Sequence, residues 1–157
     1  MNKGLLRKVL PHLVAVIVFL VVAAIYCKPA LEGKVLSQGD VTQWKGMFED
    51  MKKYKDSHGH LPLWTNGMFS GMPGYQIALE PYNPATTSYF HGLFSLWLPK
   101  PLNFFFLACI CFYFLSQVLR VNPYLGIIGA LAYAYATYNP IIIGAGHDTK
   151  MMAIGYM

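Results

Sequence analysis

The sequence contains few charged residues. Asp, Glu, Lys and Arg make up only 12% of its 157 residues, whereas an ordinary soluble domain carries about 25%. Acidic residues are the scarcer kind, with 7 against 12 basic residues, and the formal net charge is +5. Hydrophobic residues account for 55% of the chain. This composition argues against the core of a soluble enzyme.

The sequence also lacks the short motifs of several enzyme and transporter classes. It has no Walker-type phosphate loop, no Gly-Xaa-Ser-Xaa-Gly elbow, no Cys-Xaa-Xaa-Cys pair and no His-Glu-Xaa-Xaa-His motif. ATP-driven transport, serine hydrolysis and zinc-protease chemistry therefore lose their usual support. The three cysteines, Cys27, Cys109 and Cys111, have no metal-ligand spacing. We expect no particular cofactor, and a requirement for a divalent metal stays open.

The basic residues do not gather in one patch. Lys3, Arg7 and Lys8 precede the first apolar run, Arg120 lies between the later two runs, and residues 27–101 are nearly balanced in charge. This distribution follows the positive-inside tendency of membrane proteins and lacks the basic face of a nucleic-acid-binding domain. We therefore expect the lipid bilayer as a partner and no nucleic acid.

Three apolar runs without Asp, Glu, Lys or Arg dominate the chain, each close to the ~20 residues that a membrane-spanning helix needs. We predict an all-α, polytopic membrane bundle with spans over 9–26, 102–119 and 124–143. The basic residues place segment 1–8 in the cytoplasm. The remaining segments are then an extracytoplasmic loop over 27–101, a cytoplasmic turn over 120–123, an outer turn over 144–150 and the start of a truncated fourth helix over 151–157.

Two further expectations concern the two ends of the chain. A basic start followed by an apolar run also describes a secretory signal peptide, but this run exceeds the usual core of about 7 to 15 residues, which favours an anchor. The apolar start after Met151 indicates an N-terminal fragment of a larger protein. Gly126, Ala130 and Ala134 form a small-residue face where another helix can approach, and we expect it to face outward, toward a missing partner.

The first outer loop contains one clear helical pattern. Val41, Trp44, Phe48 and Met51 recur at helical spacing, which predicts an interfacial amphipathic helix over about 41–55. Asp40 would be its N-cap, with Gln43 completing a capping-box pattern. The later part of the loop, from Leu61, is rich in Gly and Pro and indicates ordered turns.

Two outer carboxylates are candidates for chemistry. Asp40 follows the first span closely and could take a proton from an acceptor hydroxyl. The alternative is that Asp40 only caps the helix, because Asp is a favoured N-cap residue. Glu32 is the second candidate, and its alternative is an ordinary surface charge.

The segment after the third span gathers polar groups at a predicted helix start. Its backbone N–H groups and a lysine would suit a phosphate. Alternatively, Asp148 or Thr149 caps the next helix while Lys150 extends to the membrane interface. With the N-terminus inside, this segment and Asp40 share the outer side of the membrane. The segment reads Gly146-His147-Asp148-Thr149-Lys150.

Three ordered motifs carry a resemblance to a known family. They are Leu31-Glu-Gly-Lys-Val-Leu-Ser-Gln-Gly-Asp-Val-Thr-Gln-Trp44, Pro62-Leu-Trp-Thr-Asn-Gly-Met-Phe-Ser-Gly-Met-Pro-Gly-Tyr-Gln76 and Gly146-His-Asp-Thr-Lys150. Together they resemble the N-terminus of the bacterial YfhO-like membrane proteins, which are similar to GT-C glycosyltransferases. Family members are several times longer than this chain, so we expect the fragment alone to be inactive.

The resemblance implies a function at the outer face of the bacterial cytoplasmic membrane. A sugar would move from a polyprenyl-phosphate donor to a cell-surface polymer acceptor. Asp40 would be the catalytic carboxylate, and the substrate-binding candidates are His147, Asp148, Lys150 and Glu32. The competing hypothesis is a non-catalytic multi-pass membrane protein, either part of a transporter or a scaffold of a surface-polymer pathway.

Overall fold

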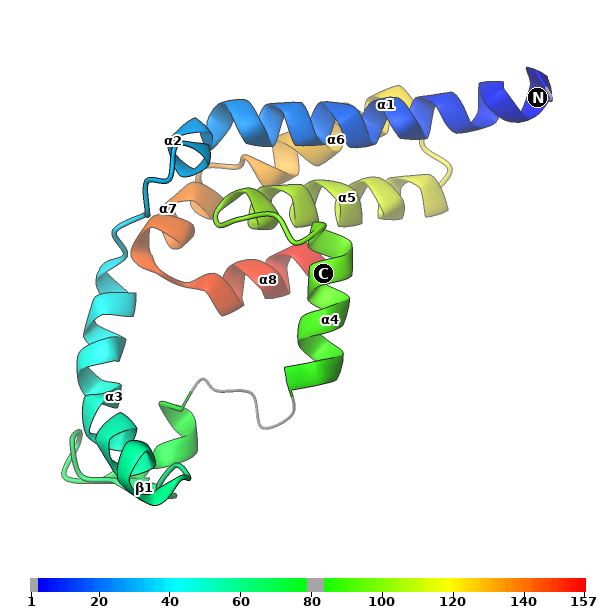
Figure 1. Cartoon of the computed structure of the whole chain (residues 1–157). Coiled ribbons are helices and arrows are strands. Elements are labelled where there is room, and N and C mark those ends of the chain that lie inside the picture. The colour runs from blue at the N-terminus through cyan, green and yellow to red at the C-terminus, as the bar shows by residue number, and fades with distance from the viewer. Residues whose placement is uncertain (1–2, 79–83) are drawn as a thin grey trace.

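The computed structural model describes residues 3–78 and 84–157 of the chain (Figure 1). Most of these residues are helical, in agreement with the all-α prediction. The helices are α1 (Lys3–Tyr26), α2 (Lys28–Leu31), α3 (Gly39–His58), α4 (Pro84–Ser95), α5 (Leu102–Val118), α6 (Pro123–Ala134), α7 (Tyr138–Ala145) and α8 (Asp148–Tyr156). The strands β1 (Trp64–Thr65) and β2 (Met72–Pro73) form an antiparallel pair, followed by the 3-10 helix η1 (Gly74–Gln76).

One helix in the described part of the chain is long and apolar enough to cross a membrane by itself. It is the segment Leu6–Tyr26 of α1. One face of α1 packs into the bundle through Ala15, Phe19 and Ala23, which are buried, while Ile17 and other large apolar side chains remain exposed. An exposed apolar surface of this kind is what a bilayer would cover.

The third apolar run, which we predicted as one span over 124–143, is not a single straight helix. It divides into α6 and α7, which are bent by 43° and meet the length and composition of a span only as a pair. The break lies between Ala134 and Tyr138, just before Asn139 and Pro140. The Asn139 amide donates to the carbonyls of Tyr133 at 2.9 Å and Ala134 at 3.2 Å. It thereby satisfies carbonyls that the end of α6 leaves without helical partners, while Pro140 falls in the first turn of α7, where an N–H is not needed.

The central helix of the bundle is α5, an apolar helix that contacts α1, α4, α6 and α8. The small-residue face of α6 packs against it, because Gly126, Ala130 and Ala134 are all buried. A Cβ atom at Gly126 would lie 2.6 Å from Oγ of Ser116 on α5. The small residues do allow a close helix contact, but the expectation that this face waits for an outside partner is wrong.

The last helix begins earlier than the sequence predicted. We placed its start at Met151, whereas α8 begins at Asp148, and the outer turn shortens to Gly146 and His147. Met151 is fully buried, and a Cβ atom at Gly155 would lie 3.0 Å from Cδ2 of Leu107 on α5. The helix α8 therefore packs closely on the bundle core.

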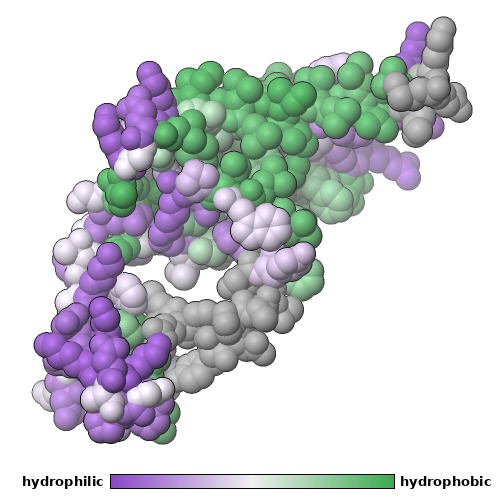
Figure 2. Space-filling model, viewed as in Figure 1, coloured by the Kyte–Doolittle hydropathy of each residue, from purple (hydrophilic) through white to green (hydrophobic). Residues whose placement is uncertain are grey.

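Residues 39–78, which we call the outer segment after the predicted topology, form a second, smaller core. Phe48 and Met51 on α3 pack with Ile77 and Ala78 of the following loop, and Trp44 Nε1 donates to the Ile77 carbonyl at 2.7 Å. The apolar face that we expected at the membrane interface is therefore filled by the chain's own loop. Figure 1 shows α3 leading away from the helical bundle, and Figure 2 shows that the face of this end turned toward the viewer is mostly hydrophilic, whereas the surface around α1 is hydrophobic.

Candidate functional site

Asp40 lies in the first turn of α3 and does not act as its N-cap. The helix begins at Gly39, so Gln38 occupies the capping position, and no side chain makes a capping hydrogen bond there. The predicted capping role of Asp40 is therefore wrong. Asp40 is the acidic residue of the first turn, where the positive end of the helix dipole favours a carboxylate.

Asp40 meets His147 from the other end of the chain. The Oδ2 atom of Asp40 lies 3.3 Å from Nε2 of His147, and both side chains are about half exposed. The sequence predicted only that Asp40 and the segment after the third apolar run share one side of the membrane; the structure places them in contact. A carboxylate beside an imidazole is a pair that can accept, hold and pass on a proton.

Gly146 brings these two side chains together. Gly146 follows the last residue of α7 and has a φ of +112°. This left-handed backbone conformation is rare for residues other than glycine. A Cβ atom here would lie 3.1 Å from Cγ2 of Val41 and 3.3 Å from Cβ of Asp40. The turn therefore approaches α3 more closely than any other residue type would allow.

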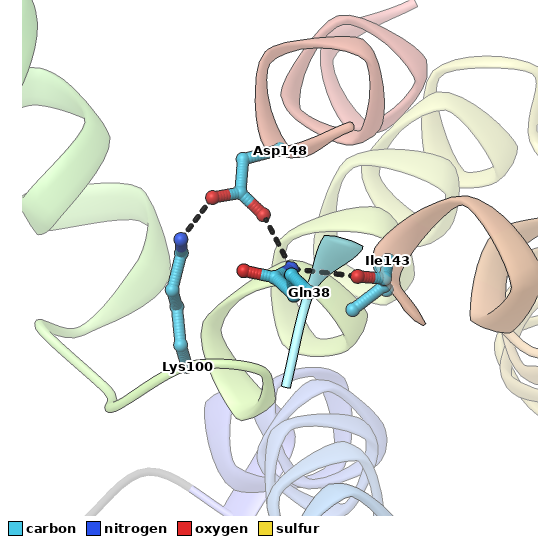
Figure 3. A network of polar contacts seen from close by, with 4 residues as sticks. All are labelled: Gln38, Lys100, Ile143 and Asp148. Carbon is cyan, nitrogen blue, oxygen red and sulfur yellow. Dashed lines mark hydrogen bonds and ion pairs between the residues drawn. The ribbon is translucent and has the colours of Figure 1, made fainter. Parts of the chain in front are cut away.

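A second network lies beside this pair (Figure 3). The buried Gln38 side chain donates from Nε2 to the Ile143 carbonyl at 2.6 Å and to Oδ1 of Asp148 at 3.2 Å. The other carboxylate oxygen of Asp148 accepts from Lys100 Nζ. The network thus connects four places in the chain: the start of α3, the loop before α5, the end of α7 and the start of α8.

The network also decides between the roles proposed for Asp148. His147 occupies the N-cap position of α8 without a capping bond, so neither Asp148 nor Thr149 caps this helix. Both Asp148 oxygens are bonded to other elements, and its side chain is mostly buried. This residue therefore joins helices, and little of its carboxylate faces solvent.

The remaining two sequence candidates lie in other surroundings. Lys150 Nζ lies over the Tyr138 ring, 5.3 Å from its centroid, in a cation–π contact. Glu32 pairs with Lys28 at 3.7 Å and with Lys34 at 3.2 Å on an exposed surface. The structure therefore brings Asp40, His147 and Asp148 to one region, and it gives Glu32 the surface ion pairs of its alternative interpretation.

Sequence reasoning missed Lys100 and the role of Gln38. Lys100 is half exposed and lies directly before α5. It is the only Lys or Arg between Lys55 and Arg120, which is the one signal that could have identified it. Gln38 gave no comparable signal, because a glutamine two residues before an aspartate has no characteristic spacing.

An apolar cavity of about 290 Å³ adjoins the network. Ile143 belongs to both, because its carbonyl accepts from Gln38 and the residue also lines the cavity. Phe105 and Leu36 contribute apolar lining, and Lys34 is the one cation among the lining residues. A chain of methyl or methylene groups is the ligand chemistry that such a lining suits.

Burial shifts the pKa values of Cys27 and His91, which both lie outside the three apolar runs. Burial raises the pKa of the Cys27 thiol to about 11, so this cysteine is unreactive at neutral pH. Burial also lowers the pKa of His91, whose Nδ1 lies 3.0 Å from the Tyr156 hydroxyl. In the described part of the chain, no group of three or more His, Cys, Asp or Glu side chains is placed to hold a metal ion.

The comparisons with known proteins add no family and no relative. No protein-family model, no curated protein and no solved structure matches this chain. The class of protein therefore has to be argued from the site itself.

Proposed function

We propose that the chain is the N-terminal portion of an integral-membrane glycosyltransferase of the YfhO-like, GT-C kind. It would lie in the bacterial cytoplasmic membrane as a multi-pass protein with its N-terminus in the cytoplasm. The proposed reaction moves a sugar from a polyprenyl-phosphate donor to a cell-surface acceptor outside the cell. The observation that carries the proposal is the contact between Asp40 and His147, a half-exposed carboxylate and imidazole close to the end of an apolar helix that could span a membrane.

Asp40 would act as the general base. Its carboxylate takes the proton of an acceptor hydroxyl while the hydroxyl oxygen attacks the anomeric carbon of the donor sugar. The bond from that carbon to the phosphate oxygen breaks, and polyprenyl phosphate leaves with the electron pair. Attack opposite the leaving group inverts the anomeric centre. His147 Nε2 lies 3.3 Å from Oδ2 of Asp40 and would orient this carboxylate, with the other carboxylate oxygen facing the acceptor.

A cation near the leaving phosphate would stabilise the charge that develops there. The resemblance points to Lys150 and His147 for this role, while the geometry adds Lys100, which is half exposed and bonded to Asp148 beside the site. The apolar cavity next to Ile143 supports a lipid-linked donor, because it offers hydrocarbon surroundings close to these polar groups.

A specific observation favours the second candidate function, a non-catalytic scaffold or transporter part. Both oxygens of the Asp148 carboxylate accept hydrogen bonds, one from Gln38 and one from Lys100. These bonds hold the surrounding helices together, and we call the three residues the clamp. In that case Asp40 and His147 would simply extend the clamp at its exposed edge.

The substitution Asp40→Asn at the native gene locus separates the two functions. Loss of a general base typically lowers a rate by about 10² to 10⁴-fold, so glycosylation of the surface polymer, measured by mass spectrometry, should fall to background at unchanged protein level. The matched control is Glu49→Gln, which neutralises an exposed carboxylate further along α3 and should glycosylate normally. Normal glycosylation by Asp40→Asn would contradict the catalytic role.

A further inference from the structure

The apolar face of α3 is not free to lie on a membrane. Met51 is 1% exposed, and Phe48 packs with it against Ile77 and Ala78 of the following loop. Any surface with which the outer segment meets a bilayer must therefore come from other side chains.

The loop that fills this face turns a different set of large apolar side chains outward. Leu63 is 80% exposed, Trp64 55%, Phe69 82% and Tyr75 61%. Strand β1 has the reverse of the usual pattern, because its indole faces out while the neighbouring Thr65 is buried. We call these four outward residues the hairpin tip.

The backbone holds the hairpin tip in this arrangement. Phe69, Ser70 and Gly71 have φ values of 51°, 60° and 120°, a run of left-handed residues that turns the chain sharply. Gly71 lies against Trp64, since a Cβ atom there would be 2.7 Å from the indole Nε1. The same Nε1 donates to Oδ1 of Asn66 at 3.0 Å, so the indole is fixed in position rather than free to fold inward.

The chemistry of the loop fits a lipid surface better than a charged partner. The eighteen residues from Leu61 to Ala78 contain no Asp, Glu, Lys or Arg. Trp, Tyr, Phe and Leu are the residues that settle at the boundary between headgroups and acyl chains. The loop also satisfies backbone groups internally, since Gly71 N–H donates to the Met68 carbonyl and Gly74 N–H to the Leu63 carbonyl.

The connection to α1 brings the loop to a membrane. Residues 32–38 link α2 to α3, so the outer segment cannot move far from the end of the apolar helix. Figure 1 shows α3 running across the direction of α1, with β1 at its far end. If α1 crosses the bilayer, α3 then runs along the membrane surface, with the hairpin tip at its far end.

We propose that the hairpin tip docks into the outer headgroup region of the bilayer that α1 crosses. This inference rests on the membrane placement contained in the proposed function, but it does not depend on glycosyl transfer. The docked tip would fix the height of α3, and with it Asp40, above the acyl chains.

The test measures the depth of spin labels in the whole chain, reconstituted in nanodiscs of phosphatidylcholine and phosphatidylglycerol. Single cysteines replace Leu63 or Phe69 in a Cys111→Ser background, in which Cys27 and Cys109 remain buried. Collision with oxygen, which concentrates in lipid, is compared with collision with a water-soluble nickel chelate. Two control positions calibrate the scale: Ile17→Cys on the exposed face of α1 and Lys53→Cys on the exposed face of α3.

Docking predicts a several-fold higher ratio of oxygen to nickel accessibility at positions 63 and 69 than at position 53. Nickel accessibility equal to that of position 53 would overturn the proposal, because the tip would then lie in water. Protection from both reagents would overturn it as well, since that pattern indicates a protein partner. A nickel-accessible label at position 17 would instead contradict the membrane placement of α1, which distinguishes failure of the proposed function from failure of the docking alone.

Discussion

The candidate site depends on two titratable side chains and on one glycine that sets the backbone between the helices. Asp40 and His147 supply the titratable atoms, but their contact depends on the left-handed backbone at Gly146. A substitution that leaves both side chains intact should therefore still separate them.

The substitution Gly146→Ala tests this dependence. An alanine in the left-handed region costs about 1 to 2 kcal/mol, and its Cβ would lie against Val41 and Asp40. We expect a lower thermal unfolding temperature in detergent and a loss of the Asp40–His147 contact. Gly144→Ala on the preceding helix is the matched control, because a Cβ there meets nothing within 4 Å. An equal stability of the two variants would contradict the role assigned to Gly146.

Helices that are distant in the sequence are joined here by one amide. Gln38 at the start of α3 bonds to the end of α7 and to the start of α8, and the Lys100 ion pair adds the loop before α5. Lys100 is half exposed, so water screens its ion pair and the buried amide should contribute more to stability.

The substitution Gln38→Ala should therefore destabilise the junction of these elements. Removing the amide takes the donor from Oδ1 of Asp148, and an unpaired buried group costs about 1 to 3 kcal/mol. The Ile143 carbonyl loses one of its two donors and keeps the Gly146 N–H. The measurement is hydrogen exchange of the amides of α8, which should become faster. The same change at the exposed Gln43 on α3 should leave this exchange unaltered. Slow exchange in both variants would refute the clamp.

At the scale of the whole molecule, the number of membrane crossings decides where the site lies. By length and composition α1 could cross a membrane alone, the bent pair α6 and α7 could cross as one unit, and α5 is apolar but shorter. Cysteines placed in the connecting segments distinguish a single anchor from the predicted multi-pass arrangement.

The predicted topology places Val35 and Thr149 outside and Val121 inside. In spheroplasts, a membrane-impermeant maleimide should therefore label Val35→Cys and Thr149→Cys directly, and Val121→Cys only after permeabilisation. The native Cys27 gives little background, because burial raises its pKa to about 11. Labelling of Val121→Cys from outside would mean that α5 does not cross the membrane, and Asp40 would then belong to a singly anchored protein.

The sequence predicted the helical class of the fold and the position of its central helix. Apolar runs fix where helices form, and α5 ends within one residue of its predicted run. Counting predicted crossings placed Asp40 and His147 on the same side of the membrane but did not predict that the two side chains touch. The break between α6 and α7 did not follow, because it depends on the Asn139 side chain reaching back to α6, a tertiary contact that periodicity does not contain.

The outer segment shows the same limit more strongly. The apolar spacing of α3 predicts a buried face, but it does not say whether lipid or protein buries it, and here Ile77 and Ala78 do so. The sequence also did not predict that Trp64 faces outward, because a strand of two residues is too short for alternation to assign its faces. Lys100 reaches Asp148 across 48 residues, and no local pattern encodes such a distance.

The separation of 110 residues between Gln38 and Asp148 also affects the order in which parts of the molecule can assemble during synthesis. At about 5 to 20 residues per second, a ribosome needs roughly 5 to 20 s to make the chain between them. The core of α3 and its loop has all its own partners within the first 78 residues, so it is complete early in this interval. The polar site is complete only after Asp148 has been made, which orders assembly of the molecule from the outer segment first to the site last.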